Sequence, residues 1–316
     1  MARFLVTGGC GFIGSHLCAA LRARGDAVRV LDDLSTGLEA NLAPGAELIR
    51  GDVADPEAVR AAMRGMDGCF HLAAIASVER GVQDWLGTHR VNLSGSIAVF
   101  DAARPRQGRP AIPVVYASSA AVYGDQATLP LTEEAVPRPL SAYGADKLGT
   151  EQHARVAGVV HGVPTLGLRF FNVFGPRQDP RSPYSGVISI FCGRLARGEA
   201  VEVYGDGGQT RDFVFVADVV AALLAGMGAA ATAAPVLNVC SGRPTSVLAL
   251  AETIAALCGV PLELRRRPPR AGEIRHSLGS PARARAVLGL PPPVGLREGL
   301  AEVIAWERAG RPGLVR

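Results

Sequence analysis

The sequence lacks closely spaced cysteines. Six cysteines are dispersed over 316 residues without a C-x-x-C pair, namely Cys10, Cys18, Cys69, Cys192, Cys240 and Cys258. Zinc-binding modules and small secreted domains both depend on cysteines at short, repeated spacings. We therefore expect buried, reduced thiols, no bound metal and a cytoplasmic location.

Long hydrophobic runs are also missing. The start, MARFLVTGGCG, has only five apolar residues before glycines intervene, and the most apolar later stretch is interrupted by Gly226, Gly228 and Pro235. A signal peptide and a membrane-spanning helix both need a longer apolar core. We expect neither in this chain.

Neither sign of charge predominates, because 33 Lys and Arg residues face 29 Asp and Glu residues. The densest basic run, formed by residues 265–267 and Arg270, contains prolines but no interleaved aromatic residues. A nucleic-acid-binding surface normally combines clustered basic residues with a recognisable binding motif. We expect a solvated loop with at most one phosphate contact, and no nucleic-acid partner.

Short apolar strands alternate with amphipathic helices over the first 120 residues. We expect strands near residues 3–8, 27–33, 47–53, 68–74 and 112–119, and helices near residues 14–25, 55–65 and 88–104. Continuous apolar strands in this alternation indicate a parallel sheet with helices on both faces. The sequence therefore predicts an α/β fold with a doubly wound parallel sheet.

The pattern changes after residue 168, where the segment FFNVFGPRQDPRSPYSG is rich in proline, glycine and arginine. Strand and helix patterns return later, and short helices alternate with proline-rich links after residue 241. No repeat or low-complexity linker separates these parts. We expect a larger lobe of residues 1–168 and 212–240, and a smaller C-terminal α/β substrate lobe of residues 169–211 and 241–316.

The segment TGGCGFIG places three glycines, Gly8, Gly11 and Gly14, between the first strand and the first helix. The first permits a tight turn, the second lets the backbone approach a pyrophosphate, and the third lets helix and strand pack closely. Exposed N–H groups at the helix start then bind the anion. This context predicts a dinucleotide-binding Rossmann domain.

An acid, Asp32, follows the second strand in VLDDLSTG. Its carboxylate can accept hydrogen bonds from both adenosine ribose hydroxyls and would repel a 2′-phosphate. NAD is therefore favoured over NADP, and an NADPH-dependent reductase would carry a basic residue here. Asp33 is interpreted as structural or close to adenine. Asp52 either contacts adenine or is an ordinary loop acid.

Tyr143 and Lys147 stand four residues apart at the start of a predicted helix, on one face. A free tyrosine has a pKa near 10 and is a poor base at neutral pH. A lysine ammonium and a positive nicotinamide nearby favour the phenolate and lower that pKa. Tyr143 can then exchange a proton with a substrate hydroxyl.

With these residues in place, the chain resembles the extended short-chain dehydrogenase/reductases, and among them the NAD-dependent nucleotide-sugar epimerases and dehydratases. The motifs TGGCGFIG, LDDLSTG, GDV, HLAA, SSAAVYG, YGADK, RFFNVFGPRQ and RDFVFVAD carry the resemblance along nearly the whole chain. It implies tightly held NAD, a small lobe that grips a nucleoside-diphosphate sugar, and a homodimer built from helices around Asn92 and Lys147.

The resemblance also implies residue roles. Ser119 matches the hydroxyl that hydrogen-bonds the sugar O4, Tyr143 the base and Lys147 the lysine that tunes the base. Tyr123 matches a packing residue. The implied cofactor residues are Gly8, Gly11, Phe12, Ile13, Gly14, Asp32, Asp33, Leu34, Ser35, Thr36, Gly37, Asp52, Val53, Leu72, Ala73, Ala74, Asn92, Tyr143, Lys147 and Phe170. The implied substrate residues are Ser77, Val78, Ser119, Tyr143, Asn172, Val187, Tyr204, Arg211, Arg270 and Ser277.

Within these roles, Arg211 and Arg270 match the arginines that clamp the diphosphate, although Arg270 is alternatively a surface arginine. Asn172 matches a residue that touches the diphosphate, and the segment from Tyr184 to Val187 resembles a uridine-side contact.

The resemblance also bears on the reaction. Dehydratases of this group carry an Asp-Glu pair after the catalytic hydroxyl, and UDP-glucuronate decarboxylases carry a Glu; here these positions are Ala120 and Ala121. Because methyl groups exchange no protons, the expected reaction is reversible oxidation at C4, and hence C4 epimerisation of a UDP-hexose. A dehydratase or a non-catalytic NAD-binding sensor is disfavoured.

The expected sugar follows from residues that resemble those of N-acetyl-accepting epimerases. Ser277 stands where a bulky tyrosine often crowds the C2 group, and Ser77 and Val78 fit the same group. We expect UDP-GlcNAc/UDP-GalNAc interconversion, with UDP-Glc/UDP-Gal as a second pair. A UDP-glucuronate 4-epimerase remains the alternative.

Overall fold

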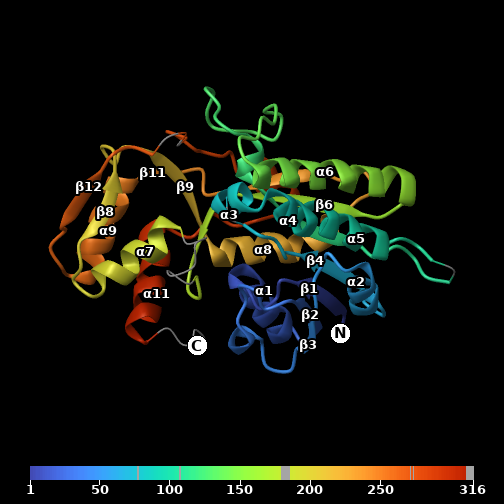
Figure 1. The fold of residues 1–316 in the computed structure, drawn as a ribbon. Coiled ribbons are helices and arrows are strands. Elements are labelled where there is room, and N and C mark those ends of the chain that lie inside the picture. Colours follow the sequence, from blue (N-terminus) through green and yellow to red (C-terminus); the bar gives the residue numbers. More distant parts are fainter. Residues whose placement is uncertain (77, 107, 179–185, 271, 273, 311–316) are drawn as a thin grey trace.

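The structure is a computed structural model that describes residues 1–316 except 77, 107, 179–185, 271, 273 and 311–316. Its larger lobe is organised around one seven-stranded sheet, in which all the pairings are parallel (Figure 1). In spatial order the strands are β10 (Val236–Val239), β6 (Thr165–Phe170), β5 (Val114–Ser119), β4 (Gly68–His71), β1 (Arg3–Thr7), β2 (Ala27–Asp32) and β3 (Glu47–Arg50).

Helices cover both faces of this sheet, because its strands are apolar on both sides. One face packs against α1 (Phe12–Ala23), α8 (Val216–Gly226) and α10 (Ala282–Leu288). The other face packs against α2 (Pro56–Met63), α5 (Gly95–Ala102) and α6 (Ala142–His161), with α3 (Val78–Gln83) and α4 (Trp85–His89) beside α6. The predicted α/β doubly wound sheet is confirmed.

Local sequence signals explain where helices begin and end. Asp55 accepts a hydrogen bond from the Glu57 N–H at 2.9 Å, and Pro56 fills the first helical position of α2. Ser141 caps α6 through the Gly144 N–H, and Gly162 ends that helix with a φ of 66°. The helix expected over 88–104 is interrupted, because residues Arg90–Ser94 form a π-helical turn between α4 and α5.

The smaller lobe contains two short sheets. One consists of β11 (Pro244–Ser246), β9 (Thr210–Phe215) and β7 (Asn172–Phe174), and the other of β12 (Leu264–Arg267) and β8 (Val201–Tyr204). They pack with α7 (Val187–Leu195), α9 (Val247–Cys258) and α11 (Leu296–Arg308) around a separate core (Figure 1).

Strand β9 lies between the two cores. Phe213 and Phe215 enter the core of the smaller lobe, whereas Val214 enters the core beneath α1 and α8. Residues 282–288 were predicted to belong to the smaller lobe, but they form α10, which packs on β10 and α8 of the larger lobe. The exact extent of the two lobes therefore stays a prediction.

The cysteines, the helix lengths and the metal-ligating side chains can be followed in the structure. All six cysteines are buried free thiols. Among the described residues, no helix is long and apolar enough to cross a membrane. The same part of the chain contains no group of three His, Cys, Asp or Glu side chains arranged to hold a metal ion.

Candidate active site

A cleft of about 520 Å³ lies at the carboxyl ends of β1, β2 and β4. Parallel α/β sheets bind their ligands at this edge. Most of the predicted cofactor residues line it, namely Gly8, Gly11, Phe12, Ile13, Gly14, Asp32, Asp33, Ser35, Thr36, Gly37, Asp52, Val53, Leu72, Ala73 and Ala74. The predicted residues outside this lining are Leu34, Asn92, Tyr143, Lys147 and Phe170.

The glycine-rich turn leaves no room for side chains. Gly8 has a φ of 71°, and a Cβ there would lie 2.8 Å from the Ala73 nitrogen. A Cβ on Gly14 would lie 2.1 Å from the Gly8 carbonyl oxygen. The turn is closed by a hydrogen bond from the Gly11 N–H to that same oxygen, at 3.1 Å. The backbone at the start of α1 therefore forms a bare anion-binding wall of the cleft.

Asp32 is 7% exposed and connects this turn to the end of β2. Its two carboxylate oxygens accept hydrogen bonds from the Cys10 and Leu34 N–H groups, both at 2.9 Å. Burial raises the pKa of Asp32, while these two hydrogen bonds act in the opposite direction. Leu34 contributes only its backbone to this arrangement, since its side chain packs against the core beneath α1.

Asn92 stands behind the wall of the cleft. Its buried amide accepts a hydrogen bond from the Ile75 N–H at 2.7 Å and donates one to the Ile75 carbonyl at 3.0 Å. Ile75 itself lines the cleft just after β4. Asn92 thus fixes a cleft-lining backbone rather than facing the cleft. Phe170 of β6 is likewise buried, and it is the register partner of Ser119 on β5.

Ser119, Tyr143 and Lys147 come together between β5 and α6. The Ser119 side chain is near enough to the Tyr143 hydroxyl to lower its pKa, and the Lys147 ammonium lies 5.8 Å from the centre of the Tyr143 ring. Lys147 also donates a hydrogen bond to the Ala117 carbonyl at 2.8 Å. Ala117 lines the cleft, so this group stands at its border.

Burial dominates the electrostatics of this group. It raises the pKa of Tyr143, while the nearby Ser119 side chain lowers it. Burial lowers the pKa of Lys147 to about 8, against the carboxylates of Asp146 and Glu151, which raise it. His71 is buried close by, and desolvation together with Lys147 lowers its pKa to about 3. His71 is therefore neutral at physiological pH.

Small residues follow Ser119 in the chain and pack against the first turn of α6. Ala120, Ala121 and Val122 form a short 3₁₀ helix, and the Ala121 N–H donates a hydrogen bond to the Ser119 hydroxyl at 3.1 Å. A Cβ on Gly144 would lie 2.6 Å from the Ala121 carbonyl oxygen. This close approach brings the first turn of α6 against the end of β5.

The structure shows two contacts that involve predicted substrate residues of the smaller lobe. The Arg270 guanidinium lies 4.0 Å from the centre of the Tyr204 ring, at the end of β8. Arg211 is the second residue of β9, and the Ser277 N–H donates a hydrogen bond at 3.1 Å to the carbonyl of Thr210, the first residue of that strand.

The remaining predicted substrate residues belong to three other segments. Asn172 is exposed at the start of β7, and Val187 begins α7. Val78 begins α3, but its side chain is not described. Ser77, Tyr184 and Ser185 lie outside the described residues.

Two cleft residues, Arg177 and Gln178, were not assigned a role from the sequence. They follow β7 and line the cleft from the smaller lobe. Arg177 has a φ of 67°, and the preceding Pro176 carbonyl lies 2.9 Å from His16 Nε2 of α1. The GPRQ run in the sequence was the available signal, but only the fold brings it beside the glycine-rich turn.

Comparisons with known proteins agree with this geometry. The model of the family described as "NAD dependent epimerase/dehydratase family" matches residues 4–240. The chain is 37% identical over 313 residues to a UDP-glucose 4-epimerase of Mycolicibacterium smegmatis, covering 97% of this chain and 98% of that protein.

Two solved structures are similar along nearly the whole chain. One is the UDP-glucose 4-epimerase of Thermotoga maritima with UDP-glucose, with a TM-score of 0.91, 34% identity, and coverage of 98% of this chain and 99% of that one. The other is the UDP-N-acetylglucosamine 4-epimerase of Methanobrevibacter ruminantium M1 with UDP-N-acetylmuramic acid, with a TM-score of 0.91, 32% identity and the same coverage.

Proposed function

Because the chain belongs to the NAD dependent epimerase/dehydratase family, as a UDP-sugar 4-epimerase that uses NAD, we propose that it inverts C4 of a UDP-hexose through a transient 4-keto sugar. The observation that carries this proposal is the grouping of Ser119, Tyr143 and Lys147 at the border of the cleft that the glycine-rich turn lines.

The cleft residues fit NAD. The turn at Gly8 and Gly14 has no space for a Cβ, which suits close contact between backbone N–H groups and a pyrophosphate. The Asp32 oxygens each accept one backbone N–H and keep lone pairs for ribose hydroxyls. A bound NAD would supply the acceptor and donor of the C4 hydride. Arg177, from the other side of the cleft, is a candidate partner for the pyrophosphate charge.

The chain's own residues move the proton. In this mechanism the Tyr143 phenolate accepts the O4 proton while Ser119 hydrogen-bonds the same oxygen. The Lys147 ammonium stabilises the phenolate, which burial alone disfavours. After the sugar turns about its bond to the diphosphate, the opposite face of C4 is presented for hydride return, and Tyr143 gives the proton back to O4.

Elimination of water is not expected from this site. An elimination step needs an acid and a base besides the group that oxidises C4. The residues that follow Ser119 are Ala120 and Ala121, and both are non-titratable. The proposed enzyme therefore oxidises C4 and puts the hydride back.

The Tyr143→Phe variant tests the reaction. It keeps the ring but removes the proton acceptor, and the expected loss of 4-epimerisation is at least about 100-fold, the range typical of general acid–base catalysis. Activity is measured on purified protein with each UDP-sugar pair, and NAD content is measured in the same samples. Retention of both NAD and activity in Tyr143→Phe contradicts the assignment of the base.

For the substrate, we propose the UDP-GlcNAc/UDP-GalNAc pair, with UDP-Glc/UDP-Gal as a second pair. Ser277 is small and half-buried beside Arg211, which leaves space for a group at C2. Arg211 and Arg270 supply the positive charge for the diphosphate. Side-by-side assays of these two pairs and of UDP-glucuronate, the alternative substrate, separate the candidates.

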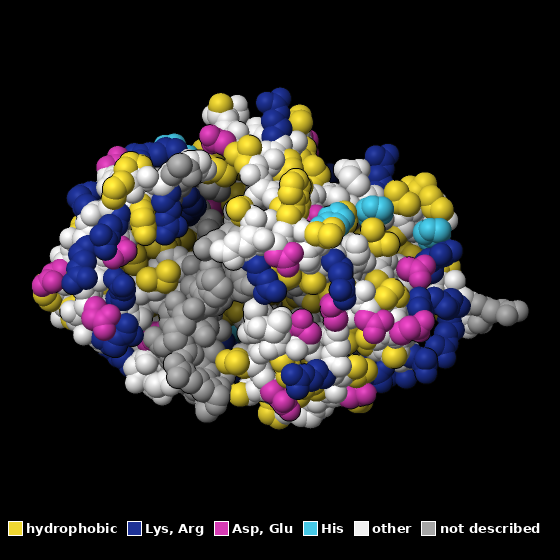
Figure 2. Space-filling view, in the orientation of Figure 1, with side chains coloured by type: hydrophobic (Ala, Val, Ile, Leu, Met, Phe, Trp, Pro, Cys, Tyr) yellow, Lys and Arg dark blue, Asp and Glu magenta, His cyan; other side chains and the backbone are white. Residues whose placement is uncertain are grey.

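We also propose a homodimer formed through α5 and α6. Exposed apolar side chains gather on these helices, namely Ile97, Val156, Val159 and Val160, and Figure 2 shows hydrophobic side chains over the end of α6. Exposed apolar side chains on neighbouring helices are typical of subunit interfaces. Light scattering of the purified protein measures the mass directly.

A further inference from the structure

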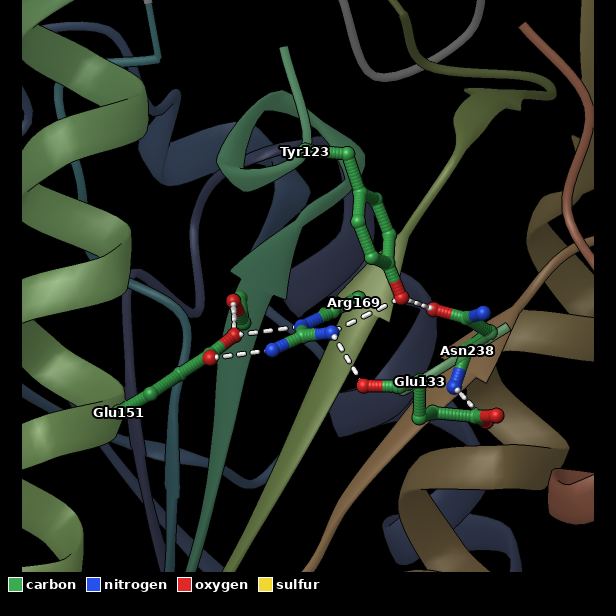
Figure 3. A network of polar contacts seen from close by, with 6 residues as sticks. Tyr123, Glu133, Glu151, Arg169 and Asn238 are labelled. Carbon is green, nitrogen blue, oxygen red and sulfur yellow. Dashed lines mark hydrogen bonds and ion pairs between the residues drawn. The ribbon is translucent and has the colours of Figure 1, made fainter. Parts of the chain in front are cut away.

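A buried ion pair lies beneath the proposed active site and takes no part in its proton transfer. Arg169 of β6 is 5% exposed and Glu151 of α6 is 6% exposed. The guanidinium donates two parallel hydrogen bonds to the carboxylate, from Nε at 2.8 Å and from Nη2 at 2.7 Å (Figure 3). Such bidentate pairs fix both position and orientation.

The Glu151 carboxylate also reaches the next strand. The Ser118 hydroxyl donates a hydrogen bond to Glu151 Oε1, and Ser118 and Arg169 are register partners on β5 and β6. One carboxylate therefore ties α6 to two adjacent strands at the same level. Ser118 directly precedes Ser119, the hydroxyl proposed to contact O4.

The other end of the network holds the chain beyond Ser119. Arg169 Nη1 donates a hydrogen bond to the Tyr123 hydroxyl at 2.8 Å, and that hydroxyl donates one to Asn238 Oδ1 of β10 at 2.7 Å (Figure 3). The Asn238 N–H in turn donates to the Glu133 carboxylate at 2.8 Å. Tyr123 follows the 3₁₀ helix that begins after Ser119. Ser119 is thus braced by the network on both sides.

Three side chains of α6 meet three successive residues of β5. Lys147 contacts the Ala117 carbonyl, Glu151 contacts the Ser118 hydroxyl, and Tyr143 contacts the Ser119 hydroxyl. Residues 143, 147 and 151 are spaced by one helical turn each and share one face of the helix. Of the three, Glu151 alone is anchored by a bidentate ion pair.

We propose that Glu151, held by Arg169, is a positioning residue that sets the register of α6 on β5, so that Tyr143 meets Ser119 and Lys147 stays beside the Tyr143 ring. This inference rests on the proposed roles of Tyr143, Lys147 and Ser119. It goes beyond them by assigning a purpose to a charge pair that contacts neither substrate nor cofactor.

Stability alone does not account for the pair. Removing two charges from water is costly, and an apolar pair of similar volume often serves a core equally well. A displacement of about 1 Å at a reacting group, by contrast, can cost about 100-fold in rate. The pair is therefore better explained by the geometry that it maintains.

The same carboxylate acts on the charge of Lys147. Glu151 raises the pKa of Lys147 against burial, as does Asp146, which is itself paired with His89 of α4 at 2.8 Å. From β4, the buried and neutral His71 is close enough for the Lys147 charge to lower its pKa. On α6 itself, the Tyr143 ring lies beside Lys147.

The first test compares Glu151→Gln with Glu199→Gln. Glu199 forms the same kind of two-point pair with Arg197, at 2.7 and 3.0 Å, but on the exposed surface of the smaller lobe. In the holoenzyme, Glu151→Gln is expected to lower kcat by about 100-fold with little change in KM, because positioning and not binding is lost. Glu199→Gln keeps both values. A Glu151→Gln enzyme with unchanged kcat overturns the proposal.

A second test separates positioning from folding. The double variant Glu151→Leu, Arg169→Met replaces the ion pair by apolar groups, so Tm is expected to return towards that of the parent while kcat stays low. A kcat that recovers together with Tm shows that the pair acts through stability alone and overturns the proposal. Ser118→Ala, which removes one link only, is the milder variant and is expected to lower kcat by about tenfold.

A third readout does not depend on activity. Ionisation of Tyr143 is followed by ultraviolet difference spectra against the matching Tyr143→Phe protein. In Glu151→Gln the Ser119 hydroxyl no longer lies beside Tyr143, so the phenolate is expected at higher pH than in the parent. Loss of the Glu151 charge also removes a group that raises the pKa of Lys147. The fall of kcat at alkaline pH, which is assigned to Lys147, is therefore expected at a lower pH than in the parent. If Tyr143→Phe retains activity, the proposed function fails, yet the titration still decides the positioning role. An unchanged titration overturns that role.

Discussion

The two parts of the proposed site are built in different ways. At the cofactor cleft, Gly8 and Gly14 leave the backbone bare, and Asp32 fixes the glycine-rich turn through N–H groups. The proposed sugar contacts Arg270 and Ser277 are side chains carried on loops outside the lining of that cleft. A backbone wall is rigid, whereas exposed side chains adapt. The difference suits an enzyme that keeps its cofactor fixed and lets its sugar turn.

The most severe way to break this comparison is to add one methyl group to the backbone side. Gly14→Ala would place a Cβ 2.1 Å from the Gly8 carbonyl oxygen. Overpacking of this kind costs about 1–3 kcal/mol, which corresponds to a loss of NAD affinity of up to about 100-fold. NAD titration of apoprotein measures the change. Gly228→Ala, where nothing lies within 4 Å, is the matched control and should bind NAD normally.

Substitution of arginines tests the proposed contact with the diphosphate. Arg270→Ala removes a proposed charged partner of the diphosphate and is expected to raise KM by about 10- to 100-fold, as loss of a hydrogen bond to a charged group does. NAD affinity should not change. Arg265→Ala, on the exposed face of β12, serves as the control. Equal effects of the two substitutions on KM would reject Arg270 as a specific contact.

The pH dependence of kcat tests the group formed by Ser119, Tyr143 and Lys147. Lys147 is proposed to act as a cation, and burial lowers its pKa to about 8. Because a lowered lysine pKa means earlier loss of charge, kcat should fall as the pH rises through about 8. A steady-state profile between pH 6 and 10, with NAD content checked at each pH, measures this limb. A flat profile above pH 8 would show that the ammonium is not required.

The smallest effect is expected on the sugar side. Ser277→Tyr would crowd the C2 group and so reduce turnover of acetylated substrates relative to UDP-Glc by about tenfold, the scale of a steric specificity change in a pocket. The ratio of kcat/KM values for the two pairs is the measurement, with UDP-Glc as the internal reference. An unchanged ratio means that Ser277 does not face the C2 group.

Local patterns made the cofactor side predictable from the sequence. The glycine spacing, the N-cap of α2 and the strand–helix alternation all depend on residues close in the chain, and each is present in the structure. The pair of Tyr143 and Lys147 was predictable for the same reason, since one helical turn joins them.

Contacts between distant segments were not predictable in this way. Arg169 and Glu151 meet because β6 and α6 pack together, and the sequence offers no periodic signal for their pairing. The placement of Arg177 beside the glycine-rich turn depends on how the smaller lobe folds back. The π-helical turn at residues 90–94 was missed as well, because its amino acids are compatible with an uninterrupted helix.

The alternation of β9 between two cores has a mechanical consequence for the site. Phe213 and Phe215 face one core and Val214 faces the other, so neither lobe can loosen without disturbing packing in its neighbour. Arg211 lies on this same strand, two residues before Phe213. The strand that carries Arg211, the proposed diphosphate contact, is thus packed into the same core as the glycine-rich turn and α1. The distance between the two bound ligands is therefore set by the packing of the folded chain.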